Sequence, residues 1–240
     1  MTYQSESCPQ KLHFSDLKQR LGFLKVDFDP ELRNSGSFKT AHPGEVQLDK
    51  GSDPLPFTGK KVCIKQVFET RNKGTGAQAG IMRIKGQHEL QAFAVESNCL
   101  IWASFLLDLT YRFVDREVRS KGQPERPIPT LRFTRGLIAI VQNTSVEKAF
   151  IVEEMIDLGS AHPFTKYLDN RFPISRIPQS APSDTQNIAD FLIFAQHVQW
   201  EKTQRSAFIS DFQGAGNLLT DPQITSNPYV CPVFDILYSN

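Results

Sequence analysis

The apolar positions of this chain change period along its length, which predicts a mixture of strands and helices. Residues 37–46 alternate in the manner of a strand, and residues 61–68 are rich in β-branched side chains. From about Glu89 to Phe113 the apolar residues recur at helical spacing, so one face of a long helix is predicted to pack against a core. The residues of this face are Leu90, Ala94, Ile101, Phe105, Leu109 and Phe113.

The second half of the chain shows the same change of period. Residues 131–141 and 149–156 are predicted to form two strands. A proline-rich stretch from Arg171 to Asp184 predicts a loop, and the spacing of apolar residues from Ile188 to Trp200 predicts a second amphipathic helix. A short strand at residues 206–210 then leads into a glycine-containing turn.

The composition is that of a globular protein, with 40% hydrophobic and 22% charged residues. Its 27 Lys and Arg residues against 26 Asp and Glu give a formal net charge of +1. Proteins that bind nucleic acid or an anionic membrane surface usually carry a basic surplus, so neither partner is expected. The four cysteines are widely scattered, and the first twenty residues lack the apolar core of a signal peptide. We therefore expect a reduced, cytoplasmic protein.

Two carboxylates in the segment after the second helix are the first candidates for chemistry. Asp211 and Asp221 lie ten residues apart, and two such groups that meet across a loop would suit Mg²⁺, with Gln213 adding an amide oxygen. Turn chemistry also favours Asp before glycine and before proline, so these residue types alone leave a structural role open. Lys65, a lone cation within an apolar strand, either points to solvent or has a function.

The same segment carries a specific resemblance. DFQGAG at residues 211–216, followed by LTDPQI at residues 219–224, resembles the D-x-Q-G-x-G…L-T-D-P-Q-I signature of the atypical alpha-kinases, the myosin heavy chain kinase and elongation-factor-2 kinase type. Upstream, Val152-Glu153 is similar to the hinge of that family. Phe164-Thr165-Lys166-Tyr167 with Asn170 is similar to its F-x-K-Y-N-N segment.

The N-terminal half extends the resemblance. Ser37 to Val46 is similar to the strand pair that covers the phosphates, and Val62-Cys63-Ile64-Lys65 to the strand that carries the nucleotide-binding lysine. The resemblance implies an α+β, two-lobed protein-kinase-like fold. We expect a poorly ordered arm at residues 1–35, a strand-rich N-lobe with the long helix at about 36–150, and a mixed C-lobe at about 151–240.

The resemblance also implies an activity, that of an ATP- and Mg²⁺-dependent serine/threonine protein kinase with a protein substrate. It implies that Lys65 contacts the ATP phosphates and that Glu153 lies at the adenine hinge. Asp211 and Gln213 would hold Mg²⁺, and Asp221 would orient or deprotonate the substrate hydroxyl. These groups suffice because phosphoryl transfer depends mainly on positioning and charge neutralisation. On the long helix, Glu96 is a candidate partner for Lys65.

The C-terminal end departs from the family pattern. In the family a G-x-G-N-x-G loop and an H-x-C-N-x-x-C cluster follow, and that cluster binds a structural zinc together with a helix histidine. His197 has the spacing of that histidine, but the residues after Ile224 offer only Cys231, which argues against a zinc site. Glu154 also stands where the hinge usually has proline. The alternative expectation is an inactive or truncated homologue that acts as a nucleotide-binding or protein-interaction module.

Overall fold

The computed structural model describes residues 20–28, 34–35, 38–50, 60–71, 80–84, 86–142, 148–156, 163–172 and 174–227. Within them the strands are β1 (Gly22–Val26), β2 (Asn34–Ser35), β3 (Lys39–Leu48), β4 (Lys61–Arg71), β5 (Gly80–Arg83), β6 (Arg132–Phe133), β7 (Gly136–Val141), β8 (Lys148–Glu154), β9 (Thr165–Leu168), β10 (Ala207–Ala215) and β11 (Leu218–Ser226). The helices are α1 (Gln87–Lys121) and α2 (Ser183–Lys202).

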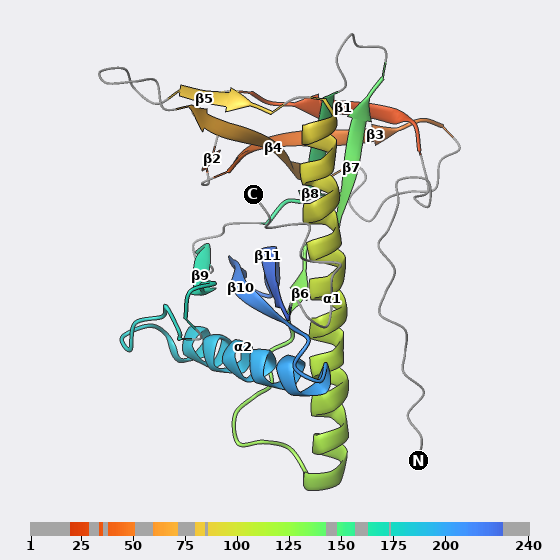
Figure 1. The fold of residues 1–240 in the computed structure, drawn as a ribbon. Coiled ribbons are helices and arrows are strands. Elements are labelled where there is room, and N and C mark those ends of the chain that lie inside the picture. The colour runs from red at the N-terminus through yellow and green to blue at the C-terminus, as the bar shows by residue number, and fades with distance from the viewer. Residues whose placement is uncertain are drawn as a thin grey trace.

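Two sheets lie one above the other, joined along one side by α1 (Figure 1). The upper sheet has the order β1-β3-β4-β8-β7, with β2 paired to β3 and β5 to β4, and these pairings are antiparallel. The lower sheet has the order β6-β11-β10-β9, in which only β6 and β11 are parallel. This strand-rich α+β architecture agrees with the expected fold class.

The N-terminal part of the chain differs from the expectation of an arm. Gly22–Val26 form β1 and pair with β3, and their alternation places Leu24 and Val26 against a buried cluster of the upper sheet. The arm expected at residues 1–35 is thus corrected for this strand. Residues 1–19 and 29–33 of the arm lie outside the described residues.

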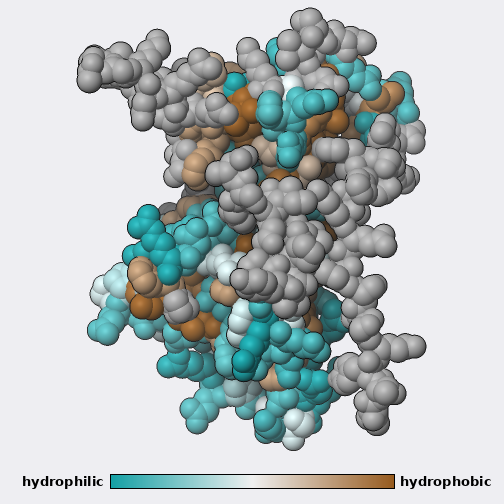
Figure 2. Space-filling view, in the orientation of Figure 1, coloured by the Kyte–Doolittle hydropathy of each residue, from teal (hydrophilic) through white to brown (hydrophobic). Residues whose placement is uncertain are grey.

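Helix α1 is longer than predicted and is shared by the two halves of the molecule. It contacts β7 and β8 of the upper sheet, and β6, β10, β11 and α2 below. By length and composition α1 would also qualify as a helix that could cross a membrane. Core helices pass the same test, and Phe93, Ala103 and Leu106 of α1 are buried among the sheets. Figure 2 shows that the lower part of the visible surface of the molecule is mainly hydrophilic.

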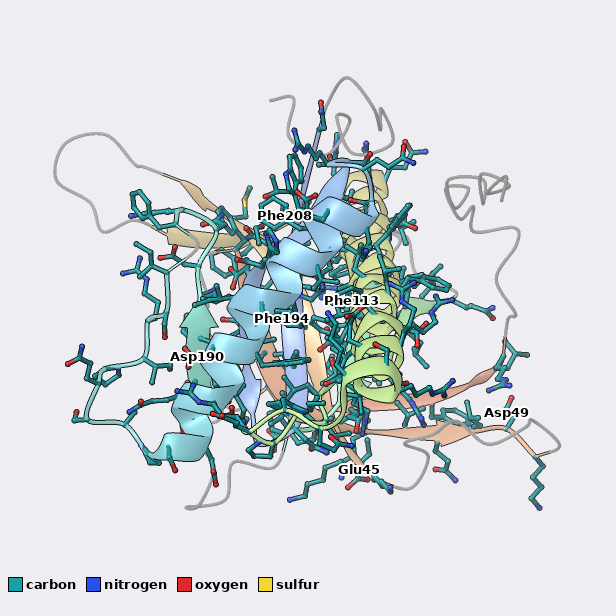
Figure 3. All side chains as sticks on the ribbon, turned by 90° about the horizontal axis from the view of Figure 1, so that it is seen from below. Glu45, Asp49, Phe113, Asp190, Phe194 and Phe208 are labelled. Carbon is teal, nitrogen blue, oxygen red and sulfur yellow. The ribbon has the colours of Figure 1, made fainter. Side chains whose placement is uncertain are left out.

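The lower half has a continuous apolar core between α1, α2 and the lower sheet. Leu168, Leu192, Ile209, Phe212 and Leu219 are fully buried there because they face inward from three strands and a helix. In Figure 3, viewed from below, α2 runs beside α1, with Phe113 and Phe194 labelled on the two helices. Their ring centroids are 6.3 Å apart. The predicted second helix is thereby confirmed, within slightly wider bounds.

The segment expected to be a turn after residue 210 is a strand instead. β10 continues to Ala215, and only Gly216 and Asn217 connect it to β11. Gly216 has a φ of +57°, the conformation that tight two-residue hairpins need. Gly214 is required for a different reason, because a Cβ atom there would lie 1.9 Å from the carbonyl oxygen of Leu218. The glycines therefore permit a close hairpin and do not end the strand.

The chain passes between the two halves more than once. After α1 it enters the lower sheet as β6, returns to the upper sheet as β7 and β8, and descends again to β9. The lobe boundary expected between residues 150 and 151 falls inside β8, which lies wholly in the upper sheet. In space, the upper half therefore extends to Glu154.

We predict that Gly214→Ala lowers the free energy of unfolding by about 3 kcal/mol, because backbone must move to admit the methyl group. Urea denaturation followed by circular dichroism measures this change. Thr225→Ala, at an exposed position of the same hairpin, is the control and should change stability by less than about 0.5 kcal/mol. Equal stability of Gly214→Ala and the control would contradict the proposed close approach.

Candidate functional site

Lys65 is the central residue of a buried polar cluster between the two sheets. It lies in β4, between β3 and β8, and only 5% of its surface is exposed. Its Nζ donates to Glu153 Oε1 at 2.8 Å, to Asp221 Oδ1 at 2.7 Å and to Thr220 Oγ1 at 3.1 Å. Burial alone would lower the pKa of Lys65, but Glu153 and Asp221 more than reverse this and raise it. The lysine is therefore held in its charged form.

Both carboxylate oxygens of Glu153 accept hydrogen bonds from neighbouring side chains. It lies in β8 opposite Cys63, next to Lys65 across the strands. Its Oε1 accepts from Lys65, and its Oε2 accepts from the hydroxyls of Thr134 at 3.0 Å and Thr220 at 2.8 Å. A buried carboxylate with three donors has its desolvation cost offset by charge-assisted hydrogen bonds. Glu153 therefore serves as the main buried counter-charge of Lys65.

The expected partnership of Lys65 with Glu96 is wrong. Glu96 of α1 instead binds Lys39 of β3, with Nζ and Oε2 2.7 Å apart, and Lys39 also lies 2.9 Å from Asp221 Oδ1. Burial would lower the pKa of Lys39, but Asp221 and Glu96 raise it. The helix carboxylate reaches the cluster through this second lysine, which the sequence did not single out.

Asp221 is presented by an irregular piece of strand. Its φ is +49°, and β11 there carries one residue more than β10, so the strand bulges between Thr220 and Gln223. Bulges of this kind redirect a side chain and are common beside active sites. Asp221 Oδ1 accepts from both Lys65 and Lys39. Burial would raise the pKa of Asp221, but the two lysines lower it well below the ordinary range of an aspartate.

Asp211 lies on the neighbouring strand in a different environment. Its carboxylate oxygens are 2.5 and 2.6 Å from Nζ of Lys166, which also donates to Gln213 Oε1 at 3.3 Å. Lys166 and Gln213 face each other across β9 and β10. Burial raises the pKa of Asp211, and Lys166 only partly opposes the shift. The two aspartates of the motif therefore have pKa values shifted in opposite directions.

The structure separates the zinc candidate from this cluster. His197 is exposed on α2, and Cys231 lies outside the described residues. Among the residues that the structure describes, no three His, Cys, Asp or Glu side chains form a group that could hold a metal ion by themselves. The oxygens of Asp211, Gln213 and Asp221 could share a hard cation with the phosphates of a nucleotide.

The structure thus brings together most of the residues predicted from the sequence. Lys65, Glu153 and Asp221 are in direct contact, and Asp211 and Gln213 lie on the adjacent strand. Sequence reasoning gave no role to Lys39, Lys166, Thr134 or Thr220. Lys39 carried the same signal as Lys65, a cation inside a predicted strand, and Lys166 and Thr220 lie within the two motif segments, whereas Thr134 carried no signal.

Comparison with known proteins gives a consistent picture. The alpha-kinase family matches residues 34–230. Solved structures of the alpha-kinase domain of myosin heavy chain kinase A are similar in fold over 85% of this chain. The complex with AMP has a TM-score of 0.50 at 14% identity and 77% coverage of that chain. The complexes with AMP-PNP and ADP have TM-scores of 0.50 and 0.52, at 14% and 16% identity, and 75% of each chain is covered. A comparison with curated proteins gave no match.

Cys63 offers a test of this electrostatic environment. Burial raises the pKa of its thiol from 9.0 to about 11, although Lys65 opposes the shift. At pH 7.5 we therefore expect iodoacetamide to modify Cys63 about a hundredfold more slowly than in the urea-unfolded chain, with the rate rising up to about pH 11. Peptide mapping by mass spectrometry follows each cysteine separately. Modification of Cys63 at the unfolded-chain rate at pH 7.5 would contradict the burial of its thiol.

Proposed function

Because the chain belongs to the alpha-kinase family, we propose that it is an ATP- and Mg²⁺-dependent protein kinase that phosphorylates a serine or threonine hydroxyl of a protein. The observation that carries the proposal is the buried Lys65 with its two carboxylates, placed between the two sheets. A charged lysine at that place can neutralise phosphate oxygens. The complexes of myosin heavy chain kinase A with AMP, AMP-PNP and ADP support a nucleotide as the ligand.

Two lysines would share the phosphates in this proposal. Lys65 and Lys39 both donate to one oxygen of Asp221, so their ammonium groups lie around a common point. Because the two lysines are already paired with the carboxylates of Glu96, Glu153 and Asp221, a phosphate would bind beside them together with a cation that offsets this negative charge. Glu153, at the end of β8, would hold Lys65 in place beside the phosphates.

The donor set fits Mg²⁺. Asp221 offers carboxylate oxygens and Gln213 an amide oxygen, and Mg²⁺ is usually bound by one or two carboxylates together with substrate phosphates. When bound, the cation would neutralise charge on the phosphates and help to align the phosphoryl group. A structural zinc at His197 forms no part of the proposal, because no three His, Cys, Asp or Glu side chains among the described residues form a group that could hold a metal ion.

The electrostatics favour a division of roles between the two aspartates that is the reverse of the one expected from the resemblance. Asp221 is bound to two lysines and its pKa is lowered, which makes it a weak proton acceptor suited to a cation. Burial raises the pKa of Asp211, which is the direction that favours a proton acceptor. Lys166 fixes the orientation of Asp211. We therefore assign the hydroxyl-facing role to Asp211 and the cation-facing role to Asp221.

The reaction can then be written with these residues. Asp211 accepts the proton of the substrate hydroxyl while the hydroxyl oxygen forms a bond to the γ-phosphorus. The bond between that phosphorus and the bridging oxygen of ADP breaks, and Lys65 and Lys39 stabilise the charge on the departing phosphate oxygens. The protein supplies positioning and charge neutralisation, which is the main demand of phosphoryl transfer.

Two matched substitutions test this assignment. We predict that Asp211→Asn retains MgATP affinity but lowers kcat by about 10²- to 10⁴-fold, because it removes the proton acceptor. Asp221→Asn should weaken MgATP binding at least about tenfold and abolish transfer, because the cation loses its main carboxylate. Isothermal titration gives the affinities, and transfer of labelled phosphate to a generic basic protein gives kcat.

The outcomes separate the candidate functions. Weak binding by Asp211→Asn with normal affinity in Asp221→Asn would restore the assignment expected from the resemblance. Equal phosphate incorporation by the wild-type chain and both variants would end the kinase proposal. MgATP-dependent thermal protection of the wild-type chain without turnover would instead identify a nucleotide-binding module, since a ligand that binds only the folded state raises its stability.

A further inference from the structure

Residues 132–135 contact both the lower strand β11 and the upper strand β8, which carry residues of the candidate site. Arg132 and Phe133 form β6 beside β11, and the next residue, Thr134, donates its backbone N–H to the carbonyl of Leu219 at 2.8 Å. Thr134 is 3% exposed. Its position is therefore set by the strand that carries Thr220 and Asp221.

The side chain of Thr134 contacts the upper sheet. Its hydroxyl donates to Glu153 Oε2, while Glu153 Oε1 holds Lys65. Thr220 donates to the same Oε2 atom, so two hydroxyls of the lower half fix one carboxylate of the upper half. One oxygen of Glu153 is thus held by two hydroxyls of the lower half, and the other by Lys65 of the upper sheet.

The residue next to Glu153 is tied to the same segment. Arg132 binds the carboxylate of Glu154 through two nitrogens, at 2.7 and 2.6 Å. Arg135 donates its N–H to Glu154 Oε2 at 3.1 Å and accepts the N–H of Glu154 at 2.9 Å. Both consecutive glutamates at the end of β8 are therefore held by residues 132–135. The two hydrogen bonds of Arg132 fix the orientation of the Glu154 carboxylate more precisely than one would.

We propose that Thr134 is a positioning residue for the phosphate-binding lysine, acting through Glu153. Its hydroxyl fixes the carboxylate that places Lys65, and its backbone ties that placement to the strand bearing Asp221. Within the part of the chain that the structure describes, Thr134 hydrogen-bonds to Glu153 and Leu219 and to neither lysine nor the candidate aspartates. This inference rests on the proposed function, since it specifies how the nucleotide site is kept in register across the two sheets.

The test compares MgATP binding and turnover in Thr134→Val and Thr134→Ser. Valine keeps the shape and removes the hydroxyl, so the dissociation constant and KM for ATP should rise about tenfold, with the KM for the protein substrate unchanged. Serine keeps the donor and should stay within about twofold of the wild type. Thr134→Ala is measured alongside, so that a folding defect of the valine variant does not remove the test.

Thr110→Val is the matched control. Thr110 is also fully buried, but its hydroxyl bonds to Leu106 and Gln199 in the core between α1 and α2. This variant should lose stability on heating while its dissociation constant for ATP stays within about twofold of the wild type. A similar rise in both valine variants would show a general packing defect and overturn the inference.

A double-mutant cycle with Glu153→Ala tests whether Thr134 affects ATP binding through Glu153. If Thr134 acts through Glu153, adding Thr134→Val to Glu153→Ala changes ATP affinity no further, whereas independent effects would add. Additive losses, or wild-type affinity in both Thr134→Val and Thr134→Ala, overturn the inference while leaving the proposed function intact. Failure of the wild-type chain to bind MgATP would overturn the proposed function, and this inference with it.

Discussion

The charge balance around one buried ammonium group organises this molecule. Lys65 is almost fully removed from water, and such a cation is tolerated only when opposite charges and hydrogen-bond acceptors surround it. One counter-charge, Glu153, comes from the upper sheet, and the other, Asp221, comes from the lower sheet. Neither sheet alone completes the shell of Lys65. The contact between the two sheets at Lys65 is therefore polar.

Much of the fold was predictable because its elements have local signatures. Periodicity indicated both helices, and β-branched residues indicated the central strand β4. The face of α1 was misplaced, because Phe93, Ala103 and Leu106 are buried whereas the predicted Phe105 is 55% exposed. The hairpin of β10 and β11 was missed because glycine is a turn signal in general, whereas Gly214 is needed for close packing and only Gly216 makes the turn. β1 was missed because its alternation is short and lies at an edge of the sheet.

The site was predictable only where its residues belong to a motif. Lys65, Glu153, Asp211 and Asp221 could be named from the sequence, although their partners could not. Lys39 and Asp221 are 182 residues apart, and no local pattern reports such a pairing. Glu96 was assigned to the wrong lysine because helical spacing gives the direction of a side chain but not which of two neighbouring strands it meets. A hydroxyl donor such as Thr134 cannot be recognised from the sequence, because threonine is common in strands for other reasons.

The path of the chain has a consequence for how the two halves relate. Because β6 belongs below while β7 and β8 belong above, neither half corresponds to one continuous stretch of sequence. A single cut anywhere in the chain would leave at least one half without part of its own sheet or of α1. The halves cannot be exchanged as modules by joining two gene fragments. We expect them to be acquired, lost and unfolded together, as one cooperative unit.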